Sequence, residues 1–126
     1  MSYLKEIELS VTTNADGDGT VTAPRPIRGQ LYAIVWLVGT LDGAVDAVFS
    51  TINHDGADAN LLTLTNASAD GIYYPRVLVQ NNAGANLTGT AGGDRALPLL
   101  VGVPKLVIAQ GGDTLTGKAY LYYFED

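Results

Sequence analysis

The stretch Gln30-Leu-Tyr-Ala-Ile-Val-Trp-Leu-Val38 is the most apolar segment of the chain, and it decides the fold class. Its β-branched, aromatic and aliphatic residues favour an extended strand. A strand that is apolar at nearly every position is typical of the centre of a sheet, where both faces are covered. We therefore expect Gln30–Val38 to be a central strand with Trp36 in the core.

On both sides of this stretch, apolar and polar residues alternate with the period of two that half-buried strands show. Ile7, Leu9 and Val11 point one way, for example, and polar side chains point the other. Pro24-Arg25-Pro26 cannot lie in a central strand, because proline does not donate to a ladder, and Pro104 separates two further strands. The remaining predicted strands are Thr20–Ala23, Val45–Ile52, Leu61–Thr65, Ile72–Val79, Leu99–Val103, Lys105–Gln110 and Lys118–Phe124.

This pattern predicts an all-β fold: a single antiparallel β-sandwich of jelly-roll type, with about eight strands, that spans residues 1–126 as one domain. A short helix over Ala44–Phe49 is a weaker alternative for one of the strands. We expect the core to contain Trp36, Val35, Leu37, Val77, Val79, Val107 and Ile108.

The composition excludes several classes of function. The chain has no cysteine, so disulfides, zinc–thiolate sites and thiol catalysis are impossible. A net charge of −6 argues against non-specific binding to nucleic acid, and no apolar run approaches the length of a membrane span. Only 16% of the residues are charged, which is low for a free monomer. We therefore expect other subunits to cover part of the surface.

Two loops match ligand-binding motifs in part. Gly112-x-x-x-x-Gly117-Lys118 has the spacing of a phosphate-binding loop, but Ala119 stands where Ser or Thr should bind Mg²⁺, and a strand pattern follows instead of a helix. A hairpin loop between two strands explains it better, with glycines that supply positive φ. The turn Asn14–Gly19 opens like an EF-hand calcium loop, but Arg25 replaces the final Glu. A hairpin turn is again the favoured interpretation, with calcium binding left open.

The polar side chains do not predict a catalytic site. His54 lies beside Asp55 and near Ser50, but the chain has no nucleophile elbow and no second histidine to bind a metal. Most acidic residues fall in glycine-rich turns, and nothing marks a pair suited to glycoside hydrolysis. We expect no catalytic residue, no metal site and no cofactor.

The four arginines are the candidate site residues: Arg25, Arg28, Arg76 and Arg95. Arginine forms planar, bidentate contacts and is enriched with tyrosine at protein interfaces. One alternative is pairing with aspartates in the turns of the same chain, and the other is contact with a neighbouring subunit. Asn81–Gly93 is predicted to be a long surface loop, and loops of this length are usually functional or disordered.

The order of these segments resembles small virion-associated proteins of tailed bacteriophages. The matching residues are Thr20–Arg25, Tyr74–Arg76 and Leu106–Gly112. The resemblance implies an all-β structural protein of the virion, assembled in the host cytoplasm. The preferred role is capsid decoration (cement), and a neck or tail-collar component is the next. The chain departs from the best-known decoration proteins in one respect, because it lacks an obvious disordered N-terminal arm.

This assignment leads us to expect contact with the major capsid protein or other virion subunits, and a homo-oligomer, with a trimer favoured. A carbohydrate-binding module is the alternative from another class. Such a module usually shows aromatic side chains on one face, and the candidates are Tyr73, Tyr74, Tyr120, Tyr122 and Tyr123. Alternation requires some of these tyrosines to lie in the core.

Overall fold

The computed structural model describes residues 3–52, 58–78, 82–85 and 95–125. These residues form strands and connecting turns, and none of them lies in a helix. The strands are β1 (Tyr3–Thr12), β2 (Gly19–Thr22), β3 (Ile27–Leu37), β4 (Asp46–Ile52), β5 (Asp58–Leu64), β6 (Gly71–Tyr73), β7 (Val77–Leu78), β8 (Arg95–Ala96), β9 (Leu99–Ala109) and β10 (Thr116–Glu125). Within this part of the chain, nothing helical has the length and hydropathy needed to cross a membrane.

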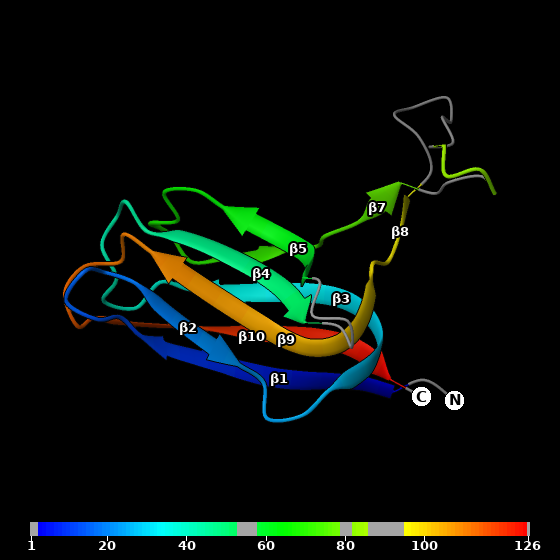
Figure 1. Ribbon diagram of the computed structural model, residues 1–126, viewed down its shortest axis with the longest axis horizontal. Helices are drawn as coiled ribbons and strands as arrows, with labels where there is room; N and C mark the ends of the chain where they lie inside the picture. The colour runs from blue at the N-terminus through cyan, green and yellow to red at the C-terminus, as the bar shows by residue number, and fades with distance from the viewer. Residues whose placement is uncertain (1–2, 53–57, 79–81, 86–94, 126) are drawn as a thin grey trace.

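Eight of the strands form two packed antiparallel layers (Figure 1). The β10 sheet has the order β1-β10-β3-β6, and the β9 sheet has the order β2-β9-β4-β5. These orders are those of an eight-stranded jelly roll, which confirms the predicted fold class. The layers are continuous along one side, because Ile27–Gln30 of β3 pairs with Leu99–Gly102 of β9.

The core lies between the two sheets and is centred on Trp36. This side chain is fully buried, its ring meets Phe49 edge-on at 6.2 Å, and its Nε1 donates to the Ala67 carbonyl at 3.1 Å. The other fully buried large side chains are Phe49, Tyr123, Leu9, Ile27, Leu31, Ile34, Leu100, Leu106, Ile108, Leu121 and Val45. The predicted burial of Trp36 and Ile108 is confirmed.

The prediction that Gln30–Val38 is buried on both faces is wrong. A two-layer sandwich covers only one face of each sheet, so alternate residues of a central strand point outward. Val35 and Leu37 alternate with Trp36 and are half-buried, as is Val107 beside Ile108. All three belong to the outward-facing set of their strands.

Two other core predictions concern the segment after β6. Val77 is 47% exposed, because β7 leaves the sandwich and pairs only with β8. Val79 lies outside the described residues, as does most of the predicted loop Asn81–Gly93. The predicted strand Ile72–Val79 is divided into β6 and β7 at Tyr74-Pro75-Arg76.

The short helix considered for Ala44–Phe49 does not form, because β4 is hydrogen-bonded to β5 on one side and β9 on the other. The sequence predicted that Pro104 separates two strands, but β9 continues through it as one strand. The Pro104 carbonyl accepts from Ala23 at 2.9 Å, just after β2 ends at Thr22. The N–H that proline lacks would point to this same side, at the end of the β2 ladder, and not toward β4. The proline therefore leaves the pairing of β9 with β4 intact.

Gly29 lets β3 and β10 approach closely at the end of the β10 sheet, where it pairs with Glu125. A Cβ on Gly29 would overlap the carbonyl oxygen of Phe124, whereas the nearest atom to a Cβ on Gly43 is the Ser68 Cβ at 3.6 Å. We expect Gly29→Ala to lower the free energy of unfolding by about 1–3 kcal/mol, since the strands must shift apart. Gly43→Ala, the matched control, should change it by less than about 0.5 kcal/mol. Urea denaturation of both variants measures this, and equal effects would contradict the argument.

Candidate functional site

The outer face of the β10 sheet carries most of the exposed apolar side chains. Six of the eight exposed large hydrophobic residues lie there: Leu4, Tyr32, Ile72, Tyr74, Leu99 and Val101. We call this surface, together with Val35, Tyr122 and Phe124 between them, the apolar face. The strand register explains the gathering: Leu4, Phe124, Gln30 and Leu99 lie in one row, and Val35 and Ile72 are neighbours in another.

A β-bulge places Tyr32 on this face. Tyr122 pairs with Ala33 and Tyr123 pairs with Leu31, so Tyr32 is the extra residue of β3. An extra residue shifts the alternation by one position. Leu31 and Ile34 therefore both reach the core, although an odd and an even position would otherwise face opposite ways, and the ring of Tyr32 points outward.

Tyr32 is the centre of the contacts on the apolar face. Its ring meets Tyr74 at 5.9 Å and Phe124 at 5.6 Å, both edge-on. The guanidinium of Arg76 lies 5.6 Å from the ring centroid, and its Nη1 donates to the Tyr32 carbonyl at 3.0 Å. Aromatic pairs of this geometry and a cation over a ring each stabilise the arrangement by up to about 1 kcal/mol. The centre of the face is therefore held in place before any partner arrives.

A shallow hollow of about 250 Å³ lies in the middle of the apolar face. Its walls are almost entirely carbon and come from all four strands of the β10 sheet or their flanks: Leu4, Tyr32, Ala33, Val35, Ile72, Tyr74 and Tyr122. Glu6 is the neighbour of Tyr122 on β1, and its interaction with the Tyr122 hydroxyl is the main reason that the pKa of Tyr122 is raised. The hollow thus has an apolar floor and an acidic rim along β1.

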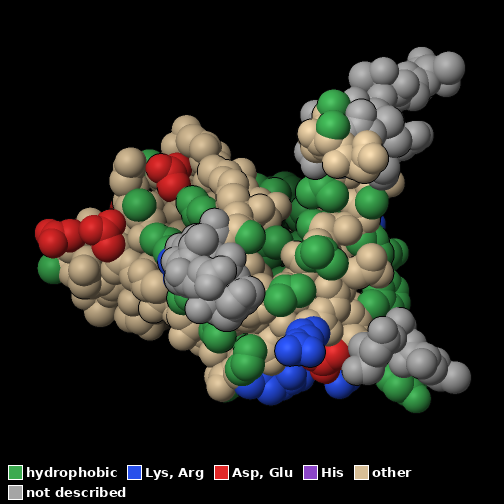
Figure 2. Space-filling model, turned by 45° about the vertical axis from the view of Figure 1, so that its right-hand side comes forward, with side chains coloured by type: hydrophobic (Ala, Val, Ile, Leu, Met, Phe, Trp, Pro, Cys, Tyr) green, Lys and Arg blue, Asp and Glu red, His purple; other side chains and the backbone are tan. Residues whose placement is uncertain are grey.

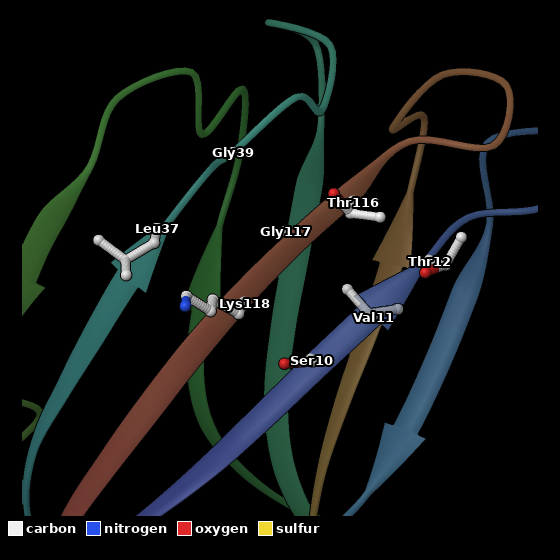
Figure 3. Close-up of a pocket in the computed structure, with 8 residues that line it drawn as sticks. All are labelled: Ser10, Val11, Thr12, Leu37, Gly39, Thr116, Gly117 and Lys118. Atoms are coloured by element: carbon white, nitrogen blue, oxygen red, sulfur yellow. The ribbon is translucent and has the colours of Figure 1, made fainter.

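The opposite end of the same outer face is polar. Ser10, Lys118 and Leu37 lie in a row across β1, β10 and β3 (Figure 3), beside a hollow of about 300 Å³. The pKa of Lys118 is raised, first by its hydrogen bond with Tyr120 and then by the charges of Tyr120 and Glu8. Lys118 therefore has its own partners on the sheet surface and does not project into the loop of the supposed phosphate motif.

The two loops that resemble ligand motifs bind each other. The amide of Gly111 donates to Gly17 at 2.8 Å, and that of Thr114 donates to Asn14 at 3.2 Å. Thr13 joins them from inside: its hydroxyl donates to the Gly112 carbonyl at 2.6 Å and accepts from the Leu115 amide at 2.9 Å. Backbone amides that a phosphate would need are thus already engaged.

The hairpin interpretation of the Gly112–Lys118 loop needs a correction. The loop joins two strands, as predicted, but β9 and β10 belong to different sheets and do not pair with each other. Gly112 has the expected positive φ of 91°, and Gln110 and Thr114 adopt positive φ as well. The Asn14–Gly19 turn is not a hairpin either, because β1 and β2 belong to different sheets; within it, the Asn14 side chain accepts from the amides of Asp16 and Asp18. Among the described residues, no group of three His, Cys, Asp or Glu side chains is arranged to hold a metal.

The candidate hydrolase residues are not brought together in the described part of the chain. Ser50 is buried in β4. His54 and Asp55 lie outside the described residues.

The four candidate arginines lie in different surroundings. Arg25 contacts Glu125 at 3.4 Å and the Tyr123 hydroxyl at 3.2 Å, so its partner is a strand glutamate and not a turn aspartate. Arg28 is exposed and lines a third hollow, of about 320 Å³, with Ile52 and Val103, where the two sheets join. Arg76 stacks on the apolar face. Arg95 is exposed in β8 and has an interaction of its own.

Two cations meet one carboxylate at the end of the sandwich near the termini. Glu125 accepts from Lys5 at 2.8 Å and from Arg25 at 3.4 Å, and its side chain is only 14% exposed. Figure 2 shows basic side chains beside an acidic one at the lower edge of the molecule, below an area with many hydrophobic side chains. The hydrogen bond from Lys5, followed by that from Arg25, lowers the pKa of Glu125 despite its partial burial.

Sequence reasoning missed the site's main residues. Tyr32 was part of an apolar run that predicted complete burial, and Leu4, Ile72 and Leu99 were single apolar residues near strand ends. The tyrosines proposed as exposed aromatic residues were predicted in part: Tyr74 is exposed and Tyr122 points outward, while Tyr123 is buried. The one available signal was Tyr-Pro-Arg at residues 74–76, where a proline interrupts a strand beside an arginine.

No protein-family model and no curated protein matches this chain. Among solved structures, it is similar to CBM32-3 from a family 31 glycoside hydrolase of Clostridium perfringens, with a TM-score of 0.42 and 16% identity over 91% of this chain and 72% of that one. It is also similar to a prokaryotic β-1,3-1,4-glucanase (lichenase) derived from a mouse hindgut metagenome. The TM-score there is 0.36, with 16% identity over 94% of this chain and 79% of that one. These likenesses concern the fold alone.

Thr13 should be essential to the packing of the two loops against each other. Its side chain is buried, and its hydroxyl is bonded to the Gly112 carbonyl and the Leu115 amide. We expect Thr13→Val to lower the free energy of unfolding by about 1–3 kcal/mol, since the Leu115 amide and the Gly112 carbonyl lose their partner. Thr12→Val is the matched control on the exposed side of β1 and should change it by less than about 0.5 kcal/mol. Denaturant unfolding of the pair decides the point; a tolerated Thr13→Val would show that the hydroxyl is dispensable.

Glu125 should make stability depend on pH in a defined direction. Its folded-state pKa is lowered, so its contribution is fully present above the unfolded value of about 4.3 and is lost as the pH falls through the folded pKa. We expect the wild type to be more stable than Glu125→Gln at pH 7, with a difference that shrinks toward pH 3. Thermal unfolding across this range measures the difference, with Asp16→Asn in an exposed turn as the control. A difference that stays constant with pH would rule out this role for Glu125.

Proposed function

We propose that this protein is a non-enzymatic structural protein of a tailed-phage virion, where it decorates the capsid as a cement protein and stabilises the shell. The observation that carries this proposal is the apolar face. Leu4, Ile72 and Tyr74 are each more than half exposed, and Leu99 is 70% exposed. Contiguous apolar surface of this kind on a soluble domain is typical of a site where another macromolecule docks.

The chemistry of the face favours a protein as the partner. It combines tyrosines and an arginine with exposed aliphatic side chains, which is the composition of the core of a protein interface. Its rings are held edge-on by one another, and the hollow between them is lined almost entirely by carbon. A neighbouring subunit with apolar side chains would fill such a hollow well.

The contact would involve the major capsid protein or other virion subunits, and the resemblance of Thr20–Arg25 and Leu106–Gly112 to virion-associated proteins supports this assignment. Arg76 lies on the apolar face and would take part directly. Arg28 and Arg95 lie outside its centre and would contribute at separate contacts, whereas Arg25 mainly holds Glu125. A neck or tail-collar position would use the same surfaces.

A carbohydrate-binding module remains the second candidate, and one observation favours it. Tyr32, Tyr74 and Tyr122 gather on one sheet face. Tyr120 and Lys118 lie farther along β10, the strand of Tyr122. Sugars stack on exposed aromatic rings, but they also need polar partners close to those rings. Glu6 is a polar group beside the hollow, next to Tyr122 in the strand pairing.

The test is to purify the phage particles whose genome encodes this chain and to measure the number of copies in each. We expect many copies per particle, and a density map should show the sandwich on the shell. Ile72→Asp should lower this occupancy about tenfold or more, because an unpaired carboxylate would be buried at the contact. Thr20→Asp, an exposed change on β2 of the other sheet, should leave occupancy unchanged.

Absence of the wild-type protein from purified particles would overturn the proposal. Binding to a glycan array that is lost in Tyr122→Ala but retained in Thr20→Asp would favour the carbohydrate module instead.

A further inference from the structure

The apolar face has opposite charges on its two edges. On one side, Glu6 projects from β1, where it is exposed and is the strand neighbour of Tyr122. On the other side, beyond β3, the guanidinium of Arg76 lies over Tyr32. The strands between these edges carry the apolar side chains. The face is therefore negative along one edge, apolar in the middle and positive along the other.

The two charges lie at the same height along the strands. Glu6 pairs with Tyr122, which pairs with Ala33, and the bulge residue Tyr32 is adjacent. Arg76 is fixed to this same point, because it donates to the Tyr32 carbonyl at 3.0 Å and stacks on the Tyr32 ring. A line drawn across the sheet from Glu6 therefore passes through Tyr122 and Tyr32 and ends at Arg76.

We propose that the apolar face binds a second copy of this chain, as an isologous pair whose two-fold axis runs parallel to the strands between β10 and β3. A rotation about this axis places the β1 edge of one copy over the β6 edge of the other and preserves the height along the strands. Glu6 of each copy then meets Arg76 of its partner, so that both edges are neutralised in one operation.

The same rotation matches the apolar middle of the face with itself. Tyr122 lies over Tyr32 of the other copy, and Leu4 lies toward Leu99, which ends the row that runs from Leu4 through Phe124 and Gln30. The Glu6 carboxylate has acceptor sites on both oxygens, which suit a guanidinium. Arg76 uses Nη1 for the Tyr32 and Pro75 carbonyls, while a guanidinium has five N–H donors.

This inference deepens the proposed function, since it names the partner that covers the apolar face. It also differs from the trimer that the sequence favoured, because a ring of three requires two different surfaces at each contact, whereas this face is complementary to itself.

The test uses the purified wild-type chain in sedimentation velocity and light scattering, across a concentration series. We expect a species of twice 13.2 kDa. Glu6→Arg and Arg76→Glu, each alone, should weaken the pair about tenfold or more, since like charges then face each other. The double variant Glu6→Arg/Arg76→Glu should recover it, because the charges are exchanged at both contacts. Asp16→Arg, a charge reversal of the same size in an exposed turn of another region, is the control and should associate like the wild type.

Three results would overturn the inference. The wild type could be a monomer even at 100-fold the concentration used for unfolding, it could be a trimer, or the single variants could associate normally. A double variant that is folded, by circular dichroism, and still monomeric would also overturn it. The particle experiment separates this outcome from the proposed function. A monomer that still occupies the shell retains the function without the pair, and a pair that is absent from particles retains the inference without the function.

Discussion

The pairing of Ile27–Gln30 with Leu99–Gly102 is the constraint on which the arrangement of this molecule depends. It makes β9 a member of both sheets, with its first residues beside β3 and its later residues between β2 and β4. The strand changes direction near Gly102, whose φ of 112° is open to glycine and strained for other residues. Because of this turn, Leu99 and Val101 extend the outer face of the β10 sheet, while Leu106 and Ile108 fill the core.

Local patterns predicted the fold class, and long-range pairing decided the details. Alternation and turn residues were enough to predict a jelly roll with Trp36 inside. The phase of the central strand could not be predicted, because the bulge at Tyr32 is fixed by its register with Tyr122 and Tyr123, far away in the sequence. The partner of Arg25 was likewise hidden, since Glu125 is 100 positions away. The candidate site consists of such pairings, and this is why most of it was missed.

The two loops with ligand-like motifs show how structural demands imitate functional ones. Glycine, asparagine and aspartate are used in phosphate and calcium loops because they allow tight turns and bond backbone groups. Here the same properties let residues 13–18 and 110–115 fit against each other around the buried hydroxyl of Thr13. A motif of this kind therefore indicates a ligand site only when it is known that the backbone groups of the loop are not already bonded within the protein.

The central place of β10 in its sheet has a consequence for synthesis on the ribosome. β1 emerges early, but the strand with which it pairs follows much later, as the Lys5–Glu125 contact across 120 positions shows. Until β10 leaves the exit tunnel, β1 and β3 have no strand between them, and the core side chains Leu9 and Ile34 lack part of their cover. A nascent chain of this topology therefore cannot form the β10 sheet until β10 arrives, because long-range pairings must wait for their partner strand. Premature termination before β10 would yield a chain that cannot complete the sandwich.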